Sequence, residues 1–162
     1  MTTHTDHDVI SLFVSRFFRS LDERKFDDDW ARAYFTDDVR GVSPLGVTEG
    51  RKALAEGTAE ALGRYARTQH IATDVVTDVV TASEGLTADG ATLTVSWNAL
   101  MTHVHLDTTL NDRGPDADPL FTVGGYYRAE LRRTPLGRRF SRMAIEAIWT
   151  RGEPPVIARR AG

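Results

Sequence analysis

The hydrophobic period of this chain changes once, near residue 68, from a helical period to the alternation typical of β-strands. Before that point, apolar residues recur at helical spacing and predict three amphipathic helices, over residues 8–24, 27–35 and 49–66. After it, β-branched residues interleaved with polar ones predict four strands, over residues 68–81, 91–106, 121–133 and 138–151. Helices followed by consecutive strands indicate an α+β fold.

The gaps between these segments carry residues typical of turns and loops. Residues 88–90 (Ala-Asp-Gly) and 134–137 (Thr-Pro-Leu-Gly) predict tight connections, so neighbouring strands are expected to be antiparallel. Pro44 and Gly46 mark a loop before the third helix, and the polar residues 108–120 predict a long loop, either a lid or a plain connection. The simplest arrangement is a curved sheet whose concave face is closed by the helices, with a pocket between them.

Composition narrows the class of protein. The 162 residues are 41% hydrophobic and 27% charged, which suits one domain with its own core. A formal net charge of −3 argues against nucleic acid as a partner, because phosphate contacts need a basic surface. The chain lacks cysteine, a phosphate loop, a dinucleotide glycine motif and a nucleophile elbow. It has no signal-peptide pattern and no apolar stretch near the ~20 residues of a membrane span, so a cytoplasmic protein without membrane partners is expected.

Three histidines stand inside the apolar strands, which is unusual for a titratable side chain. Alternation places His103 and His105 on the apolar face of their strand with Met101, and His70 stands in the preceding strand. Each is either a structural histidine held by hydrogen bonds or a proton-transfer group that faces a cavity. The His-x-His spacing of His103 and His105 also allows a metal site, if His70 or Asp22 supplied a third ligand.

A histidine that acts as a base needs a carboxylate to orient its ring. Asp74 shares the face of His70 but lies about 13 Å along the strand, too far for direct contact. Asp22 is the better candidate, because it follows the core residue Leu21 at the end of the first helix's apolar face. The alternative is that Asp22 is an exposed acid at a helix end.

Several short motifs occur together in an order and spacing that match a known family. They are residues 22–25 ahead of Trp30, 67–70, 124–128 with 131–133, 137–140, and 147–149 running into 152–153. On these motifs, over about residues 8–153, the chain resembles the scytalone dehydratase and SnoaL-like group of the nuclear transport factor two (ketosteroid isomerase-like) superfamily. The resemblance implies one domain over residues 1–162 with a flexible tail at 154–162. Its fold would be a cone-shaped α+β barrel, in which three N-terminal helices pack on a curved, mainly antiparallel sheet and enclose a pocket.

The resemblance also implies a function. His70 matches the family's catalytic histidine, Asp22 the acid that orients it, and His103 a second histidine of the pocket. The expected activity is that of a cyclase, isomerase or dehydratase acting by general acid–base catalysis on a polyketide-like small molecule of bacterial secondary metabolism. The alternative is a non-catalytic ligand-binding or assembly module of the same fold, in which Asp22 does not contact His70.

General chemistry supports the enzymatic interpretation. A neutral imidazole can take a proton from a carbon next to a carbonyl while a carboxylate fixes its tautomer, and this step requires no metal or organic cofactor. His103 or Tyr127 is expected to donate a hydrogen bond to the oxygen that develops charge. The substrate is expected to contact apolar side chains and one further histidine, namely Phe17, Trp97, Met101, His105, Tyr127 and Trp149.

The outer face of the last two predicted strands carries Tyr126, Ala144 and Ile148 among charged residues such as Arg128 and Glu130. A mixed face of this kind suits packing against a second copy, and the superfamily resemblance also favours a homodimer. A solvated face of an antiparallel sheet would show the same alternation.

Overall fold

The computed structural model describes residues 4–81 and 91–155. Within these residues lie four helices, α1 (His4–Glu23), α2 (Asp28–Tyr34), α3 (Arg51–Gly63) and α4 (Asp107–Arg113). The strands there are β1 (Phe35–Ser43), β2 (Gly46–Glu49), β3 (Tyr65–Thr81), β4 (Thr92–His105), β5 (Leu120–Thr134) and β6 (Gly137–Arg151). The three predicted helices and four predicted strands are confirmed, with small shifts at their ends.

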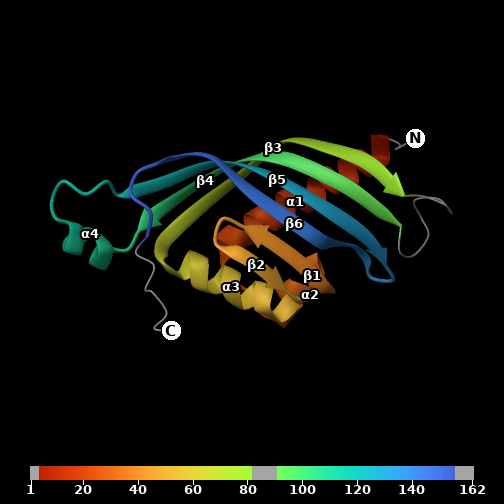
Figure 1. Cartoon of the computed structure of the whole chain (residues 1–162), viewed down its shortest axis with the longest axis horizontal. Coiled ribbons are helices and arrows are strands. Elements are labelled where there is room, and N and C mark those ends of the chain that lie inside the picture. The colour runs from red at the N-terminus through yellow and green to blue at the C-terminus, as the bar shows by residue number, and fades with distance from the viewer. Residues whose placement is uncertain (1–3, 82–90, 156–162) are drawn as a thin grey trace.

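The strands form one curved, open sheet in the order β2-β1-β6-β5-β4-β3. Neighbouring strands are antiparallel except β1 and β6, which run parallel. Figure 1 shows α1, α2 and α3 on one side of this sheet and α4 at the far end of β4 and β5. The predicted class, an α+β fold with helices on a curved and mainly antiparallel sheet, is therefore confirmed.

Two parts of the fold differ from the prediction. Residues 42–48, expected to be a loop, belong to the β1–β2 hairpin, where Gly46 turns the chain with a φ of +127°. A register shift between Phe35 and Arg40 interrupts the alternation of β1, which hides this strand from a period-two pattern. Part of the expected loop 108–120 belongs to α4, which buries none of its residues and so shows no apolar face.

The predicted tight connection at residues 134–137 joins β5 and β6. The Thr134 hydroxyl donates to the carbonyl of Gly137 at 2.6 Å and accepts from the N–H of Leu136 at 3.2 Å. Gly137 has a φ of +100°, which a residue with a side chain rarely adopts. The other predicted turn, at residues 88–90, lies outside the described residues, although β3 and β4 on either side pair antiparallel as expected.

α1 is apolar on one face only. Ile10, Val14 and Leu21 are buried against the sheet, whereas Val9 and Leu12 on the opposite face are exposed. Each fully buried side chain of this size contributes about 1.5–3 kcal/mol, so this face supplies much of the force that holds α1 on the sheet. Among the described helices, none combines the length and hydropathy that crossing a membrane requires.

The concave face of the sheet forms the other half of the core. In β4 every second residue is buried, and Leu93, Val95 and Trp97 are fully enclosed. His103 and His105 follow in the same phase and are 7% and 1% exposed, because the side-chain period of a strand is two. The strand that builds the core therefore also carries two titratable rings into the interior.

Candidate active site

The end of α1 and the middle of β3 meet at Asp22 and His70. Asp22 lies in the last turn of α1, directly after the buried Leu21. His70 pairs with Met101 of β4, on the concave side of the sheet. Two residues 48 positions apart in the sequence are thus brought together by the packing of α1 on β3.

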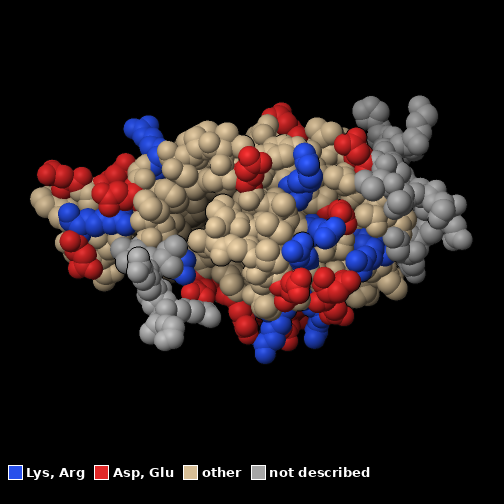
Figure 2. All heavy atoms as spheres, viewed as in Figure 1, with Lys and Arg blue, Asp and Glu red and all other residues tan. Residues whose placement is uncertain are grey.

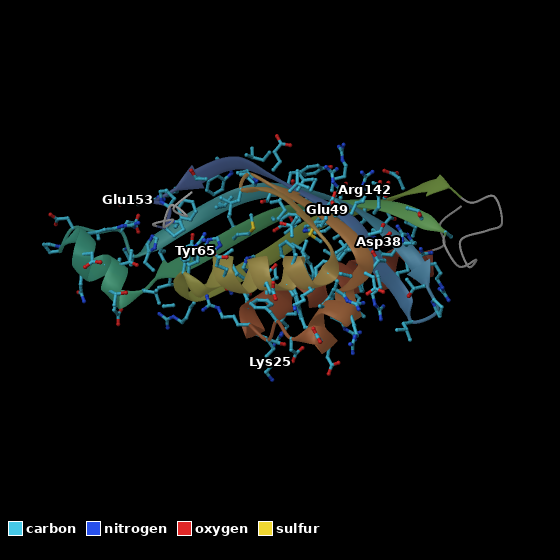
Figure 3. All side chains as sticks on the ribbon, turned by 60° about the horizontal axis from the view of Figure 1, so that its bottom comes forward. Lys25, Asp38, Glu49, Tyr65, Arg142 and Glu153 are labelled. Atoms are coloured by element: carbon cyan, nitrogen blue, oxygen red, sulfur yellow. The ribbon has the colours of Figure 1, made fainter. Side chains whose placement is uncertain are left out.

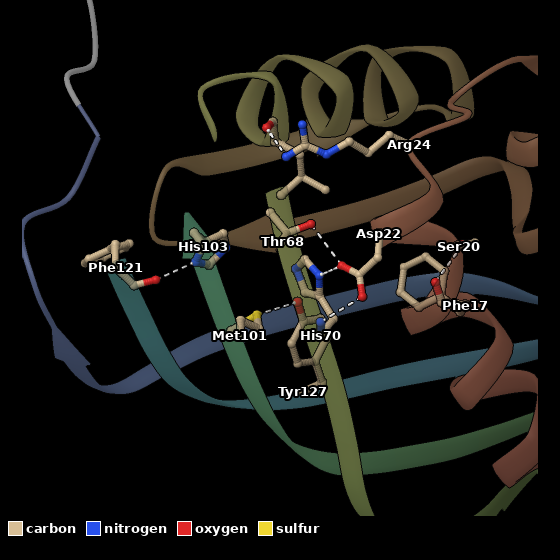
Figure 4. Close-up of polar contacts among 11 residues, drawn as sticks. Phe17, Ser20, Asp22, Arg24, Thr68, His70, Met101, His103, Phe121 and Tyr127 are labelled. Carbon is tan, nitrogen blue, oxygen red and sulfur yellow. Dashed lines mark hydrogen bonds and ion pairs between the residues drawn. The ribbon is translucent and has the colours of Figure 1, made fainter. Parts of the chain in front are cut away.

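Asp22 accepts three hydrogen bonds from β3 (Figure 4). Its Oδ1 lies 2.6 Å from Nδ1 of the His70 ring and accepts from the Thr68 hydroxyl at 2.9 Å. Its Oδ2 accepts from the backbone N–H of His70 at 2.9 Å. Because both oxygens are used, the carboxylate is fixed relative to the ring, and the contact that the sequence predicted between these two residues is present.

The hydrogen bond to Asp22 determines the tautomer of His70. An ionised carboxylate can only accept, so Nδ1 carries the ring proton and Nε2 presents a lone pair. The side chain of His70 is 3% exposed, and the ring of Phe18 packs edge-on against it with centroids 5.9 Å apart. Nε2 forms no hydrogen bond with the residues that the structure describes. His70 therefore offers a shielded basic nitrogen that is not used within the described fold.

Asp22 is held in its ionised form. Burial raises the pKa of its carboxyl, but the hydrogen bonds from the His70 ring, the His70 backbone and Thr68 together outweigh burial and lower the pKa below 3.8. At neutral pH an anion therefore lies against Nδ1–H. Such an anion stabilises the imidazolium that forms when Nε2 takes up a proton.

His103 faces His70 on the concave side, with ring centroids 5.7 Å apart and the planes at 88°. Its Nδ1 lies 3.0 Å from the carbonyl oxygen of Phe121, and because a carbonyl only accepts, Nδ1 carries the proton. Burial lowers the pKa of His103 to about 4, so the ring is neutral at pH 7 and its Nε2 can only accept. The expectation that His103 donates to the substrate is therefore corrected, since this ring presents an acceptor.

The other predicted hydrogen-bond donor, Tyr127, is already engaged. Its hydroxyl donates to the sulfur of Met101 at 3.4 Å, and its ring stacks on Trp97 with centroids 4.9 Å apart. The Phe18 ring packs against Tyr127 and also against His70, which links this cluster to the pair. Phe17 points mainly into a neighbouring aromatic cluster, which contains Trp30, Tyr34, Phe35 and Phe140. It also meets the Phe18 ring edge-on, with centroids 6.0 Å apart, and so lies one ring away from His70.

Trp149 does not lie in the wall of this site. It is 50% exposed on the convex face, where its indole covers Gly124 so closely that a Cβ at Gly124 would collide with the ring. A register shift between Gly124 and Gly125 adds one residue to β6 at this point. Since one extra residue moves a side chain to the other face of the sheet, this bulge turns Trp149 outward, contrary to expectation.

His105 lies at the end of β4, where the segment after β6 crosses it. Its Nε2 donates to the carbonyl oxygen of Glu153 at 2.9 Å. The Tyr65 ring lies beside it, 5.6 Å from the His105 ring and 4.5 Å from the His103 ring, centroid to centroid. Figure 3 shows Tyr65 and Glu153 toward the end of the molecule that carries α4. His105 is thus a structural neighbour of the site and not a member of the pair.

A metal site is not built from these histidines in the part of the chain that the structure describes. His103 and His105 share one face, as expected, but each has one ring nitrogen bonded to a backbone carbonyl. The described residues contain no group of three or more His, Asp or Glu side chains that could hold a metal ion.

Within the described residues, the sheet has an unpaired edge along the second half of β6. In the described sheet, β1 pairs with β6 only as far as Ala144, which leaves the rest of β6 without a neighbour on that side. Figure 2 shows the surface hollowed there, between the end of β6 and the β1–β2 hairpin.

Sequence reasoning missed several residues that contact Asp22 or the histidines. Thr68 stands two positions before His70, so strand alternation could have placed it beside Asp22. Phe18 stands four positions before Asp22, on the same helix face. Tyr65 had no comparable signal, because a register shift separates it from the regular part of β3. Burial raises the pKa of Tyr65 to about 12, so its hydroxyl stays protonated beside His103.

Fold and site together define a class of protein, an α+β cone with an aspartate–histidine pair between its first helix and its sheet. The sequence profile of the SnoaL-like domain matches residues 2–144. The chain therefore belongs to the SnoaL-like family, and the predicted resemblance is confirmed. No curated protein matches the chain.

Solved structures share the fold at low sequence identity. The Kfla4162 protein from Kribbella flavida has a TM-score of 0.73 at 20% identity, covering 91% of this chain and 93% of that one. A nuclear transport factor 2 (NTF2-like) superfamily protein from Salmonella enterica has 0.66 at 13%, covering 96% of each chain. The hexachlorocyclohexane dehydrochlorinase LinA-type3 from Novosphingobium barchaimii has 0.67 at 15%, covering 89% and 87%. These similarities establish the fold.

Proposed function

We propose that this protein is an acid–base enzyme in which Nε2 of His70 moves a proton of a small organic substrate, without a metal or an organic cofactor. The observation that carries the proposal is the hydrogen bond of 2.6 Å between Nδ1 of His70 and the ionised Asp22, in a ring that is 3% exposed. A histidine with a purely structural role needs its polar atoms satisfied. Here one nitrogen is held by an anion, and the other is left as a base without a partner among the described residues.

The first step is removal of a proton from a carbon next to a carbonyl group. Nε2 takes the proton, the electron pair of the C–H bond forms a C=C bond, and the π pair of the carbonyl moves to its oxygen, which gives an enolate. The imidazolium then holds two protons, with Nδ1–H still bonded to Asp22. The carboxylate offsets the positive charge and keeps the ring oriented through the step.

The same proton completes the reaction. His103 cannot supply a second proton at pH 7, because it is neutral and its only N–H is bonded to the Phe121 carbonyl. His70 therefore returns the proton, and its destination defines the reaction. If the proton goes to another carbon, the reaction is an isomerisation. If it goes to a departing hydroxyl, with C–O cleavage and C=C formation, the reaction is a dehydration. Delivery to a carbonyl oxygen that the enolate carbon attacks is cyclisation.

The groups around the pair support the proposed substrate class. A carbonyl is needed to stabilise the carbanion, and a hydroxyl suits Nε2 of His103, which only accepts. Met101 and Tyr127 supply an apolar surface. Polyketide-like intermediates of bacterial secondary metabolism combine these features. A dehydrochlorinase among the structural neighbours supports an elimination, since loss of HCl also begins with removal of a proton.

The proposal is tested with aromatic β-hydroxyketones and poly-β-ketones incubated with chelator-treated protein in D₂O. We expect exchange of the proton next to the carbonyl, or formation of a dehydrated, isomerised or cyclised product, above the rate without protein. Nuclear magnetic resonance measures both. A compound that binds but neither exchanges nor reacts would favour the non-catalytic ligand-binding module.

We also propose that two copies pair through the convex face of the sheet. This face exposes large apolar side chains in neighbouring strands, namely Ile71, Leu100, Ile148 and Trp149. Arg142 and Glu130, 3.8 Å apart, lie further along β6 and β5 toward the hairpin that joins these strands, which leaves paired charges away from the apolar area.

Light scattering at micromolar concentration should give twice the 18.0 kDa mass of one chain. Trp149→Asp should reduce the mass to that of one chain, because a charge would be buried at the contact. Leu136→Asp is the matched control, since Leu136 is 76% exposed at the tip of the β5–β6 hairpin. A wild-type mass of one chain, or a dimer unchanged by Trp149→Asp, would contradict the proposed interface.

A further inference from the structure

Arg24 follows the pair-forming Asp22 by two residues and has an unusual backbone conformation. Its φ is +58°, the left-handed region, and its N–H bonds to the carbonyl of Ser20 at 3.3 Å. Helices commonly end on a residue of this conformation, but the residue is usually glycine, because a side chain costs about 1 kcal/mol or more there. This conformation ends α1 at Glu23, one residue after Asp22.

The side chain of Arg24 crosses from α1 to the junction of α3 and β3 (Figure 4). One terminal nitrogen donates to the carbonyl of Tyr65 at 2.8 Å, and the other donates to the carbonyl of Leu62 at 2.9 Å. Leu62 lies in the last turn of α3, where its carbonyl also accepts from the backbone N–H of the C-cap residue Arg64 and the helix dipole attracts a cation. Arg24 thereby ties the end of α1 to the first residue of β3.

These hydrogen bonds of Arg24 affect the geometry of the Asp22–His70 pair, because the two members of the pair lie on different elements. Asp22 belongs to α1, whereas His70 and Thr68 belong to β3. A hydrogen bond of 2.6 Å tolerates little displacement, and at about 3.6 Å it no longer exists. The planar, two-pronged guanidinium can bond to two carbonyls at once, which the single ammonium of lysine does less rigidly.

We propose that Arg24 is a positioning residue for the Asp22–His70 pair, because its guanidinium holds the end of α1 at the distance from β3 that the short hydrogen bond requires. This inference rests on the proposed function of the pair. It assigns Arg24 no contact with the substrate. The guanidinium acts through the carbonyls of Leu62 and Tyr65 and forms no hydrogen bond to Asp22 within the described residues.

Arg24→Gly tests the role of the Arg24 side chain while the backbone keeps its conformation. Glycine adopts the left-handed conformation readily, so this variant removes the guanidinium without strain at the helix end. Arg24→Lys keeps the charge and part of the reach. Arg19→Met is the matched control, because the Arg19 side chain on the same helix is 84% exposed and contacts only Glu23, at 3.7 Å, among the described residues.

The decisive measurement is the nuclear magnetic resonance signal of the His70 Nδ1 proton, which needs no substrate. In the wild type, the short bond to a carboxylate should give a downfield, slowly exchanging resonance, assigned by its absence in His70→Asn. We expect Arg24→Gly to lose this resonance or shift it upfield, Arg24→Lys to show an intermediate shift, and Arg19→Met to keep the wild-type signal. Turnover of a reactive compound should fall about 10-fold to 10²-fold in Arg24→Gly, mainly in kcat.

A wild-type resonance in Arg24→Gly would overturn the inference, whatever the thermal midpoint of that variant. A lowered midpoint with an unchanged resonance would show that Arg24 only stabilises the fold. If Arg24→Gly does not fold, a wild-type resonance in Arg24→Lys overturns the inference, and an altered one supports it. If the resonance responds as expected but no compound reacts, the positioning role stands and the proposed catalytic function fails.

Discussion

His70→Asn should lower turnover at least about 10²-fold, the usual contribution of a positioned proton-transfer group, while the thermal midpoint stays nearly unchanged. The variant removes the basic nitrogen, Nε2. Asp22 keeps the hydrogen bonds from the Thr68 hydroxyl and from the backbone N–H of residue 70, so the carboxylate is not left without donors. Steady-state kinetics and a thermal melt measure the two quantities on the same preparation.

Asp22→Asn removes the charge of the carboxylate but keeps its shape. The amide oxygen can still accept from Nδ1 of His70, but it offers no charge to stabilise the imidazolium. Turnover should therefore fall less than in His70→Asn, and the acid limb of the pH profile should shift. An active His70→Asn variant with a strongly lowered thermal midpoint would make His70 a structural residue. An unchanged pH profile in Asp22→Asn would remove Asp22 from the mechanism.

The free energy of unfolding should decrease by about 3 kcal/mol as the pH falls from above 6.5 to below 4, because of His103. Burial is the main cause that lowers the pKa of this histidine from 6.5 to about 4, against the hydrogen bond to the Phe121 carbonyl, which raises it. Between these pH values the unfolded chain binds a proton that the folded chain does not. The stability is therefore complete above pH 6.5 and is lost as the pH falls toward 4.

The contribution of His103 is isolated by comparing the wild type with His103→Asn in denaturant titrations at pH 7, 5.5 and 4. The Asn amide can still donate to the Phe121 carbonyl but does not titrate, so the variant should lose less stability over this range. Asp22 does not account for this loss, because its lowered pKa gives stability that is complete above about pH 4 and is lost at lower pH, equally in both proteins. Parallel pH dependences of the two proteins would show that His103 is not buried in its neutral form.

The regular elements of the fold could be predicted because their patterns are local. The helical spacing of Ile10, Val14 and Leu21 records which side of α1 is buried. The alternation of Leu93, Val95 and Trp97 does the same for β4. β1, β2 and α4 were not predicted, since a bulge interrupts β1 and α4 buries none of its residues.

The candidate site could likewise be predicted where a local pattern determines it, and not where strand pairing does. Strand phase placed His103 and His105 on the inner face, and the apolar face of the first helix pointed to Asp22 as the partner of His70. The phase was misleading at Trp149, because a single extra residue in β6 reverses the face of every side chain after it. Bulges of this kind arise from the pairing of whole strands, so the residues of β6 alone do not show which side Trp149 faces.

The sequence by itself determined which residues are apolar, which are titratable and in what period they recur, and these properties were enough for the α+β class and for Asp22 and His70 as partners. Only the tertiary structure decided which nitrogen of each ring carries the proton. That choice depends on the acceptors that other segments place nearby, the Asp22 carboxylate for His70 and the Phe121 carbonyl for His103. Both acceptors are distant in sequence, so the difference between a base and a neutral acceptor arises from packing between elements.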